Sequence, residues 1–235
     1  MSEIVSNLFA VEAAKWEERY QQKYFQDRRD VLDRWLARTR KALGSRALDL
    51  GCGTFPMETI FKRHNLSATG LDASREMIDL ARGLGREAQH YSGPDLPFDN
   101  AAFDCVIMFN VLEFVENPGR FIGEINRVSR PDATLLMTFT NFGGVFRRSL
   151  MAVKGVVTAK PHREPDYVLS QFRYADIARM LREAGFEKIG IFRYSWPWAY
   201  ERLFSWLPDF AVEMFLRNRF FADCVYVEAR QKSAR

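Results

Sequence analysis

The sequence predicts an α/β fold that is doubly wound around a mostly parallel sheet. From residue 46 onward, short apolar segments alternate with amphipathic segments of helical period, and strands separated by such helices form parallel sheets through right-handed crossovers. The segment FDCVIMF at 103–109 is almost continuously apolar, as expected for a strand buried on both faces. The 235 residues, 47% hydrophobic and 27% charged, match one globular domain.

The individual elements follow in order from this alternation. Apolar residues at a spacing near 3.6 predict helices within residues 1–44. Strands are then expected at Arg46–Leu50, Ala68–Leu71, Ala88–Tyr91, Phe103–Phe109 and Ala133–Thr140. The helices between them are expected near Met57–His64, Arg75–Leu84 and Gly119–Val128. After a long connection, the pattern resumes with a helix at Tyr174–Ala184 and strands at Lys188–Tyr194 and Cys224–Ala229.

Composition excludes several classes of protein. The apolar stretches are shorter than the ~18–20 residues of a membrane span, and the start of the chain has no basic region ahead of an apolar run. The three cysteines are too few and too scattered for a disulfide framework, and no zinc-ligand spacing occurs. A cytoplasmic protein without a bound metal is expected.

The strongest functional signal is ALDLGCGTF at 47–55. An apolar strand ends near Asp49 and runs directly into Gly51, Cys52 and Gly53. Glycines between a strand and a helix let the backbone bend sharply and approach a ligand closely. The alternative is a tight turn without a ligand. A dinucleotide-binding fingerprint would need a third glycine where Pro56 stands, which disfavours a nicotinamide oxidoreductase.

The second signal is Asp72 in TGLDAS at 69–74, which lies 21 residues beyond Gly51. An acidic residue about 20 residues after such a turn is where a ribose diol is held, because two carboxylate oxygens match two hydroxyl donors. The alternative is that Asp72 or Ser74 only caps the helix that starts at Arg75.

The third signal is the polar pair Asn110 and Glu113, which follow the buried fourth strand. Ligands of open α/β sheets bind outside the carboxyl ends of the strands, so Asp49, Asp72 and Asn110 are expected to converge on one crevice. Glu113 is either a binding carboxylate or base, or a solvated helix residue.

These motifs resemble those of the class I S-adenosylmethionine-dependent methyltransferases, of the type found in ubiquinone and menaquinone biosynthesis. The matching segments are LDLGCGT, TGLDAS, DLPFDNAAFDCV, NRVSRPDATLLMTF and FRYADIARMLREAGFEKI. The likeness covers about Arg46–Thr140 and Phe172–Tyr194, roughly half of the chain. It implies a Rossmann-like sheet of seven strands with an N-terminal helical cover (1–44), a cofactor-binding core (45–141), an aromatic helical lid (142–221) and a last strand and tail (222–235), all in one domain.

The resemblance also implies a role for each matching residue toward the cofactor S-adenosyl-L-methionine, whose product is S-adenosyl-L-homocysteine. Asp49, Gly51, Cys52 and Gly53 would border the methionine end, and Asp72 would hold the ribose. The other implied contacts are Ala73 and Met77 near the adenine, Ser92 and Gly93 at its edge, and Asn110 beside the sulfonium.

Several positions depart from the family pattern. Phe55 stands in place of the third glycine, and its ring is expected to narrow or reshape the cofactor site. Ser92 replaces a common aspartate, which would weaken the adenine contact. Pro131-Asp132-Ala133 replaces a Pro-Gly-Gly turn and is expected to be a loop change. Phe114 replaces a histidine that would be a candidate base.

The methyl acceptor is expected to be a small hydrophobic or aromatic metabolite, methylated on oxygen, nitrogen or carbon. Residues 142–221 contain 17 of the 33 aromatic residues, which either line an acceptor pocket or pack the lid onto the sheet. Glu113, His162 and Tyr174 are weak candidates for a catalytic role, and no strong base declares itself.

Other partners and functions remain as alternatives. Basic amphipathic segments in 142–221 favour possible peripheral membrane contact with a lipid-like acceptor. Nucleic acid is not an expected partner, because the basic residues form no compact run and the net charge is only +4. A catalytically silent binding or partner subunit is the alternative that Phe55 and Ser92 favour. The oligomeric state is not predicted.

Overall fold

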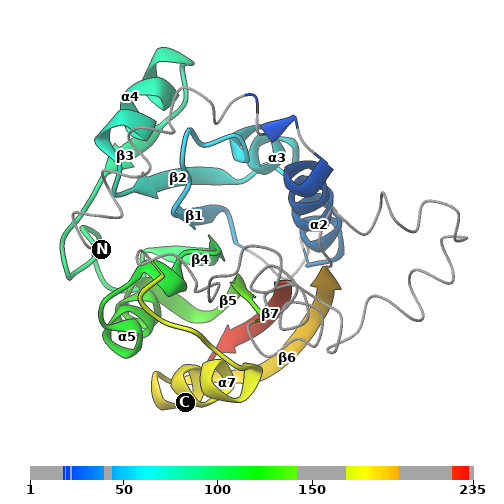
Figure 1. The fold of residues 1–235 in the computed structure, drawn as a ribbon, viewed down its shortest axis with the longest axis vertical. Coiled ribbons are helices and arrows are strands. Elements are labelled where there is room, and N and C mark those ends of the chain that lie inside the picture. Colours follow the sequence, from blue (N-terminus) through cyan, green and yellow to red (C-terminus); the bar gives the residue numbers. More distant parts are fainter. Residues whose placement is uncertain are drawn as a thin grey trace, which may run out of the picture.

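A computed structural model of the chain describes residues 18, 20–21, 23–39, 44–141, 168–195 and 224–232. Within these ranges, the sheet has seven strands in the order β3-β2-β1-β4-β5-β7-β6. Strands β1 to β5 run parallel to one another, and β7 runs antiparallel to both β5 and β6. This order confirms the predicted doubly wound sheet, and helices lie on both of its sides (Figure 1).

The observed bounds follow the predicted ones closely. The strands are β1 (Arg46–Leu50), β2 (Ser67–Asp72), β3 (Ala88–His90), β4 (Phe103–Phe109), β5 (Ser129–Thr140), β6 (Phe186–Ser195) and β7 (Cys224–Gln231). The helices are α2 (Lys23–Thr39), α3 (Glu58–Arg63), α4 (Arg75–Gly83), α5 (Pro118–Val128) and α7 (Tyr174–Glu183), with a short 3₁₀ turn η2 (Leu112–Phe114).

The fifth strand differs from the prediction. It begins at Ser129, four residues earlier than expected, and Pro131 and Asp132 lie inside it and not in a loop before it. Asp132 has a positive φ of 67°, and the pairing with β4 shifts register between Phe103 and Cys105. Between these two pairs β4 advances by two residues and β5 by five, from Ser129 to Thr134. This irregularity is tolerated because the extra residues of β5 are left out of the ladder. Helical and strand periods in the sequence do not reveal it.

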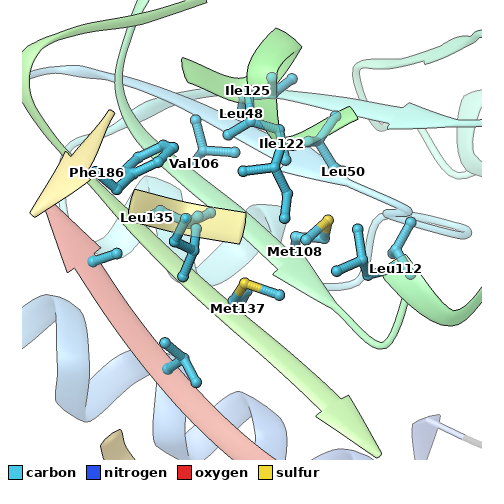
Figure 2. Close-up of a cluster of buried hydrophobic side chains, with 14 of the residues drawn as sticks. Leu48, Leu50, Val106, Met108, Leu112, Ile122, Ile125, Leu135, Met137 and Phe186 are labelled. Carbon is cyan, nitrogen blue, oxygen red and sulfur yellow. The ribbon is translucent and has the colours of Figure 1, made fainter. Parts of the chain in front are cut away.

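One face of the sheet packs against α5 and α7. Leu48, Val106 and Leu135 of the three central strands meet Ile122 and Ile125 of α5 in a fully buried cluster (Figure 2). Apolar residues at helical spacing on α5 meet Val106 and Met108 of β4, whereas Cys105 and Ile107 of this strand belong to the core on the opposite face. The contact with α5 fixes the strand ends that carry the functional residues.

The opposite face packs against α2, α3 and α4. Leu32, Trp35 and Leu36 of α2 are fully buried against Phe61 of α3 and Ile107 of β4. The helical period of the N-terminal segment is therefore confirmed for Lys23–Thr39. Residues 1–17, most of the predicted lid (142–167 and 196–223) and the tail after 232 lie outside the described residues.

Candidate functional site

The glycine turn after β1 is tightly packed and has left-handed backbone at both glycines. Gly51 has φ +71° and Gly53 has φ +56°, conformations that residues with a side chain adopt at a cost. A Cβ atom at Gly51 would lie 2.2 Å from the Val111 side chain, and one at Gly53 would lie 2.5 Å from the hydroxyl of Tyr20. The Gly51 N–H donates to the carbonyl of Leu71 at 2.8 Å, which ties the turn to the end of β2.

Asp72 ends β2 beside this turn and organises both loops around it. Its Oδ2 accepts a hydrogen bond from the Gly53 N–H at 2.8 Å, and its Oδ1 accepts one from the Ser74 N–H at 2.8 Å. Burial raises the pKa of the Asp72 carboxyl, although these backbone N–H groups oppose the rise. Each carboxylate oxygen keeps a second lone pair that a ligand hydroxyl can use.

Helix capping accounts for Ser74 but not for Asp72. Ser74 is the N-cap of α4, and its Oγ accepts from the Met77 N–H at 3.3 Å. Asp72 instead bridges the glycine turn and the cap. The alternative that these residues only cap the helix therefore holds for Ser74 and not for Asp72.

Asp49 lies on β1 one strand away, paired in register with Gly70 of β2. Asp49 is only 4% exposed, and its carboxylate accepts no hydrogen bond from the described residues. Burial, with a smaller contribution from the nearby Asp72, raises the pKa of Asp49 to about 8. An unpaired buried carboxylate is costly, so this position favours a positively charged or donor group from a ligand.

A pocket of about 310 Å³ opens beside the turn and Asp72. This volume falls at the lower end of the ~300–1,000 Å³ of small-molecule sites. Five residues predicted for the site line it: Gly51, Asp72, Ala73, Ser92 and Gly93. The other lining residues are Leu50, Leu71, Tyr91, Pro94, Val111, Val115, Glu116, Asn117, Arg120 and Phe121.

The other predicted residues lie behind or beside the pocket wall. Gly53 is tied to Asp72 by a hydrogen bond, and Asp49 lies on β1 before the turn; neither residue lines the pocket. Cys52 and Met77 are buried, 5% and 2% exposed, and do not line the pocket. The Cys52 thiol lies 3.4 Å from the Gly53 carbonyl oxygen, and burial holds its pKa well above the ordinary value, so the thiol stays neutral.

Asn110 belongs to a second polar group at the ends of β4 and β5, which we call the β4–β5 cluster (Arg28, Asn110, Glu113, Thr138 and Thr140). The Asn110 Oδ1 accepts from Arg28 Nη2 at 2.6 Å and from Thr138 Oγ1 at 2.9 Å. Its Nδ2 donates to Thr140 Oγ1 at 3.1 Å and to Glu113 Oε1 at 3.2 Å. The backbone of Asn110 is left-handed, φ +51°, a conformation that asparagine tolerates.

Glu113 is the acidic member of the β4–β5 cluster and is 2% exposed. Its Oε1 also accepts from the Thr140 N–H at 2.6 Å, whereas its Oε2 is buried and has no hydrogen-bond partner within the described residues. The expectation of a solvated helix residue is therefore wrong. Tyr174 begins α7 and is partly buried, and His162 lies outside the described residues.

Phe55 does not enter the pocket. Its ring is fully buried, 6.2 Å from the ring centroid of Phe61, on the side of the turn that faces α3. A Cβ atom at Gly70 would lie 2.9 Å from the Phe55 Cγ, so the glycine on β2 makes room for the ring. Phe55 therefore reshapes the packing beneath the turn and does not narrow the described pocket.

Three contributors to the site were missed at the level of sequence. Tyr20 and Arg28 come from the N-terminal cover, and Tyr91 follows β3. Tyr20 is 8% exposed above the glycine turn, and burial raises its pKa. No local pattern marks these residues, although Tyr91 does stand directly before the predicted Ser92 and Gly93.

Two further structural findings concern metals and membranes. The described residues contain no group of three or more His, Cys, Asp or Glu residues that could hold a metal ion. No helix among them is both long enough and apolar enough to cross a membrane.

The fold and the pocket together define a class of protein. A glycine turn after β1, an acidic residue at the end of β2 and a sheet in the order 3-2-1-4-5-7-6 with β7 antiparallel are the features of class I S-adenosylmethionine-dependent methyltransferases. Residues 20–190 match the family described as "Methyltransferase domain". The chain belongs to this family.

Curated relatives carry names in agreement with this family. The chain is 28% identical over 163 residues to a ubiquinone biosynthesis O-methyltransferase of Aromatoleum aromaticum, covering 65% of this chain and 68% of the relative. It is 31% identical over 145 residues to the uncharacterized protein MJ1123 of Methanocaldococcus jannaschii, covering 61% of this chain and 65% of that protein. The match thus spans less than two thirds of MJ1123.

Solved structures share the fold. Magnesium protoporphyrin IX methyltransferase (ChlM) from Synechocystis PCC 6803, with bound SAH, has a TM-score of 0.67 at 17% identity, covering 97% of this chain and 99% of that one. A possible histamine N-methyltransferase from Thermotoga maritima has a TM-score of 0.64 at 16% identity, covering 96% and 99%. At these identities the likeness concerns the fold alone.

Proposed function

We propose that this chain binds S-adenosylmethionine in the described pocket and transfers its methyl group to a small hydrophobic or aromatic metabolite. The observation that carries the proposal is the pair of buried carboxyl groups, Asp49 and Asp72, on either side of a glycine turn at the pocket. A positively charged amine of a ligand supplies the partner that Asp49 lacks among the described residues, and a vicinal diol uses the second lone pairs of the Asp72 oxygens. The described residues fit the cofactor for this reason.

Each residue then has a task in binding. Gly51 keeps the turn open for close approach, and Asp72 offers lone pairs to the ribose hydroxyls. Asp49 stabilises the ammonium group of the methionine portion, directly or through water. Ala73, Ser92 and Gly93 line the region for the base.

The bound cofactor supplies a methyl group on a sulfonium, which is already a good leaving group. The protein therefore mainly aligns the acceptor and excludes water. The β4–β5 cluster lies next to Val111, a pocket residue, and is the described polar group best placed to meet the acceptor. The free Oε2 of Glu113 could accept a proton from an acceptor hydroxyl if the acceptor reaches it.

The acceptor class rests on the aromatic content of residues 142–221 and on the relatives. The Aromatoleum relative is named for ubiquinone biosynthesis, and a Tropheryma whipplei relative, 31% identical over 98 residues, is named a demethylmenaquinone methyltransferase. Ring-shaped apolar acceptors are therefore the first to test. The aromatic residues that would contact them lie largely outside the described residues.

The first experiment is calorimetric titration of the purified protein with S-adenosylmethionine and with S-adenosylhomocysteine. Micromolar binding of both is expected, and Asp72→Ala should weaken it by more than a hundredfold, because hydrogen bonds to a charged group contribute ~1.5–3 kcal/mol each. Asp79→Ala is the matched control, since Asp79 is exposed on α4 and should bind normally.

Turnover is measured next as S-adenosylhomocysteine formed with a panel of phenolic, quinol and amine acceptors. Product with at least one acceptor class, absent in Asp72→Ala, supports the proposal. Tight cofactor binding without turnover on any acceptor would favour the silent binding subunit. Because Phe55 lies outside the pocket, Ser92 is the remaining departure that favours that alternative.

A further inference from the structure

Tyr91 is a pocket residue with an unused hydrogen-bonding group. Its backbone N–H donates to the carbonyl of Asp72 at 2.8 Å. This hydrogen bond holds Tyr91 next to the residue that is proposed to bind the ribose. Its hydroxyl oxygen is buried and has no hydrogen-bond partner within the described residues. A Cβ atom at Gly93 would lie 3.5 Å from this oxygen, which places the hydroxyl beside a second pocket residue.

The charged neighbours of this hydroxyl are occupied with one another. Arg120 Nη2 donates to Asp95 Oδ1 at 2.6 Å, and Arg127 Nη2 donates to Glu124 Oε2 at 2.8 Å. Glu124 Oε2 also accepts from the Leu96 N–H at 2.9 Å. These pairings leave the hydroxyl without a hydrogen-bond partner among the residues that the structure describes.

The hydroxyl is neutral at physiological pH. Burial, followed by the nearby Asp95 and Glu124, raises the pKa of Tyr91 to about 12. A neutral hydroxyl can both donate and accept a hydrogen bond. A buried polar group without a partner destabilises the protein, and a ligand that supplies the partner recovers that free energy.

Resting on the proposed function, we propose that the Tyr91 hydroxyl is the group that recognises the edge of the cofactor's base. Asp72 binds the ribose in this proposal. The wall from Tyr91 to Pro94 is formed by the loop that follows β3, and it lines the same pocket. The hydroxyl lies against Gly93, which lines the same wall of the pocket.

This assignment has a consequence for specificity. An ionised carboxylate only accepts hydrogen bonds, so it requires an amino group on the base. The wall from Tyr91 to Pro94 carries no acidic side chain, and a tyrosine hydroxyl can accept from an amino group or donate to a carbonyl oxygen. The chain should therefore bind the deaminated nucleoside nearly as well as the adenosyl compound.

The test compares S-adenosylhomocysteine with S-inosylhomocysteine by calorimetry. For the wild-type protein the two dissociation constants are expected within about tenfold of each other. Tyr91→Phe keeps the ring and removes the hydroxyl, and it should weaken the binding of both ligands by about fivefold, which corresponds to the ~1 kcal/mol of one net hydrogen bond. Ser92→Asp places a carboxylate on the same wall and should restore a strong preference for the adenosyl ligand.

Thermal unfolding without ligand separates recognition from folding. Tyr91→Phe should be as stable as the wild type or more stable, because it removes an unpaired buried group. Unchanged affinity of Tyr91→Phe for both ligands would overturn the inference. So would a wild-type preference above a hundredfold that Glu116→Gln abolishes, because Glu116 on the opposite wall would then read the base. Failure of the wild type to bind either ligand would instead contradict the proposed function.

Discussion

The carboxyl edge of the sheet carries two polar regions with opposite states of pairing. At the ends of β1 and β2, Asp49 has no partner among the described residues and Asp72 holds two loops while facing a pocket. At the ends of β4 and β5, Asn110 and its neighbours bond mainly to one another. In the sequence the two regions look alike, because each consists of polar residues at or after the end of a strand.

This difference separates a ligand site from a scaffold. Unpaired buried groups cost free energy that a ligand can recover, whereas a paired network stiffens the strand ends that hold it. The β1–β2 region is therefore where binding should be most sensitive to substitution. The β4–β5 cluster should affect stability first, and its exception is Glu113 Oε2, which has no hydrogen-bond partner among the described residues.

The largest expected effect concerns Asp49 and pH. Its pKa rises from 3.8 to about 8 in the folded chain, so the folded state holds a proton that the unfolded state releases. The contribution to stability is full below pH ~4 and is lost as pH rises toward 8, at ~1.4 kcal/mol per pKa unit. Asp49→Asn should remove this dependence and be more stable than the wild type at pH 8–9, as urea unfolding at pH 5 and 9 would show.

Cofactor binding should reverse the same effect. A ligand ammonium beside Asp49 favours the carboxylate, so binding near pH 7 should release a proton. Calorimetry in buffers of different ionisation enthalpy measures this release, which Asn at this position should abolish. The nearby titratable groups are Asp72, Cys52 and Cys105, and burial raises the pKa of both thiols. Equal binding enthalpies in all buffers would contradict the role given to Asp49.

The next effect tests the β4–β5 cluster. Glu113→Ala removes the acceptor for the Thr140 N–H and for Asn110 Nδ2, and it should destabilise the fold by about 2–4 kcal/mol. Affinity for S-adenosylhomocysteine should change less than threefold. Glu113→Gln, which keeps the accepting oxygen, should cost under ~1 kcal/mol. A large loss of cofactor affinity in Glu113→Gln would contradict the assignment of ligand binding to the β1–β2 region and of stability to the β4–β5 cluster.

The smallest expected effect tests how tightly the glycine turn packs against Val111. Gly51→Ala forces a methyl group against Val111 and a side chain into φ +71°, which should cost about 1–3 kcal/mol. Val111→Ala in the same chain should recover the steric part but not the backbone part. A double-mutant cycle by urea unfolding measures the coupling, and strictly additive effects would show that the two residues do not touch.

Much of this arrangement could be predicted from the sequence. Strands β1 and β4 were predicted with their observed bounds, because a run of apolar residues between turn signals constrains a strand strongly. Gly51 and Asp72 were predicted at one site because residues at the ends of neighbouring parallel strands meet at one edge of the sheet, whereas Ser92 was implied by the resemblance to the family. Asn110 was expected in the same crevice but does not line the pocket. Residue type and spacing sufficed for Gly51 and Asp72.

The remaining features depended on contacts that no local pattern encodes. Arg28 meets Asn110 across 82 residues of sequence, and the Tyr20 hydroxyl lies against Gly53 of a distant segment. The direction of the Phe55 ring depends on the space that Gly70 leaves on the next strand. The sequence by itself determined the class of fold and the chemical groups at the strand ends. Only the tertiary structure decided which groups are paired and which remain open to a ligand, because pairing is set by packing between segments far apart along the chain.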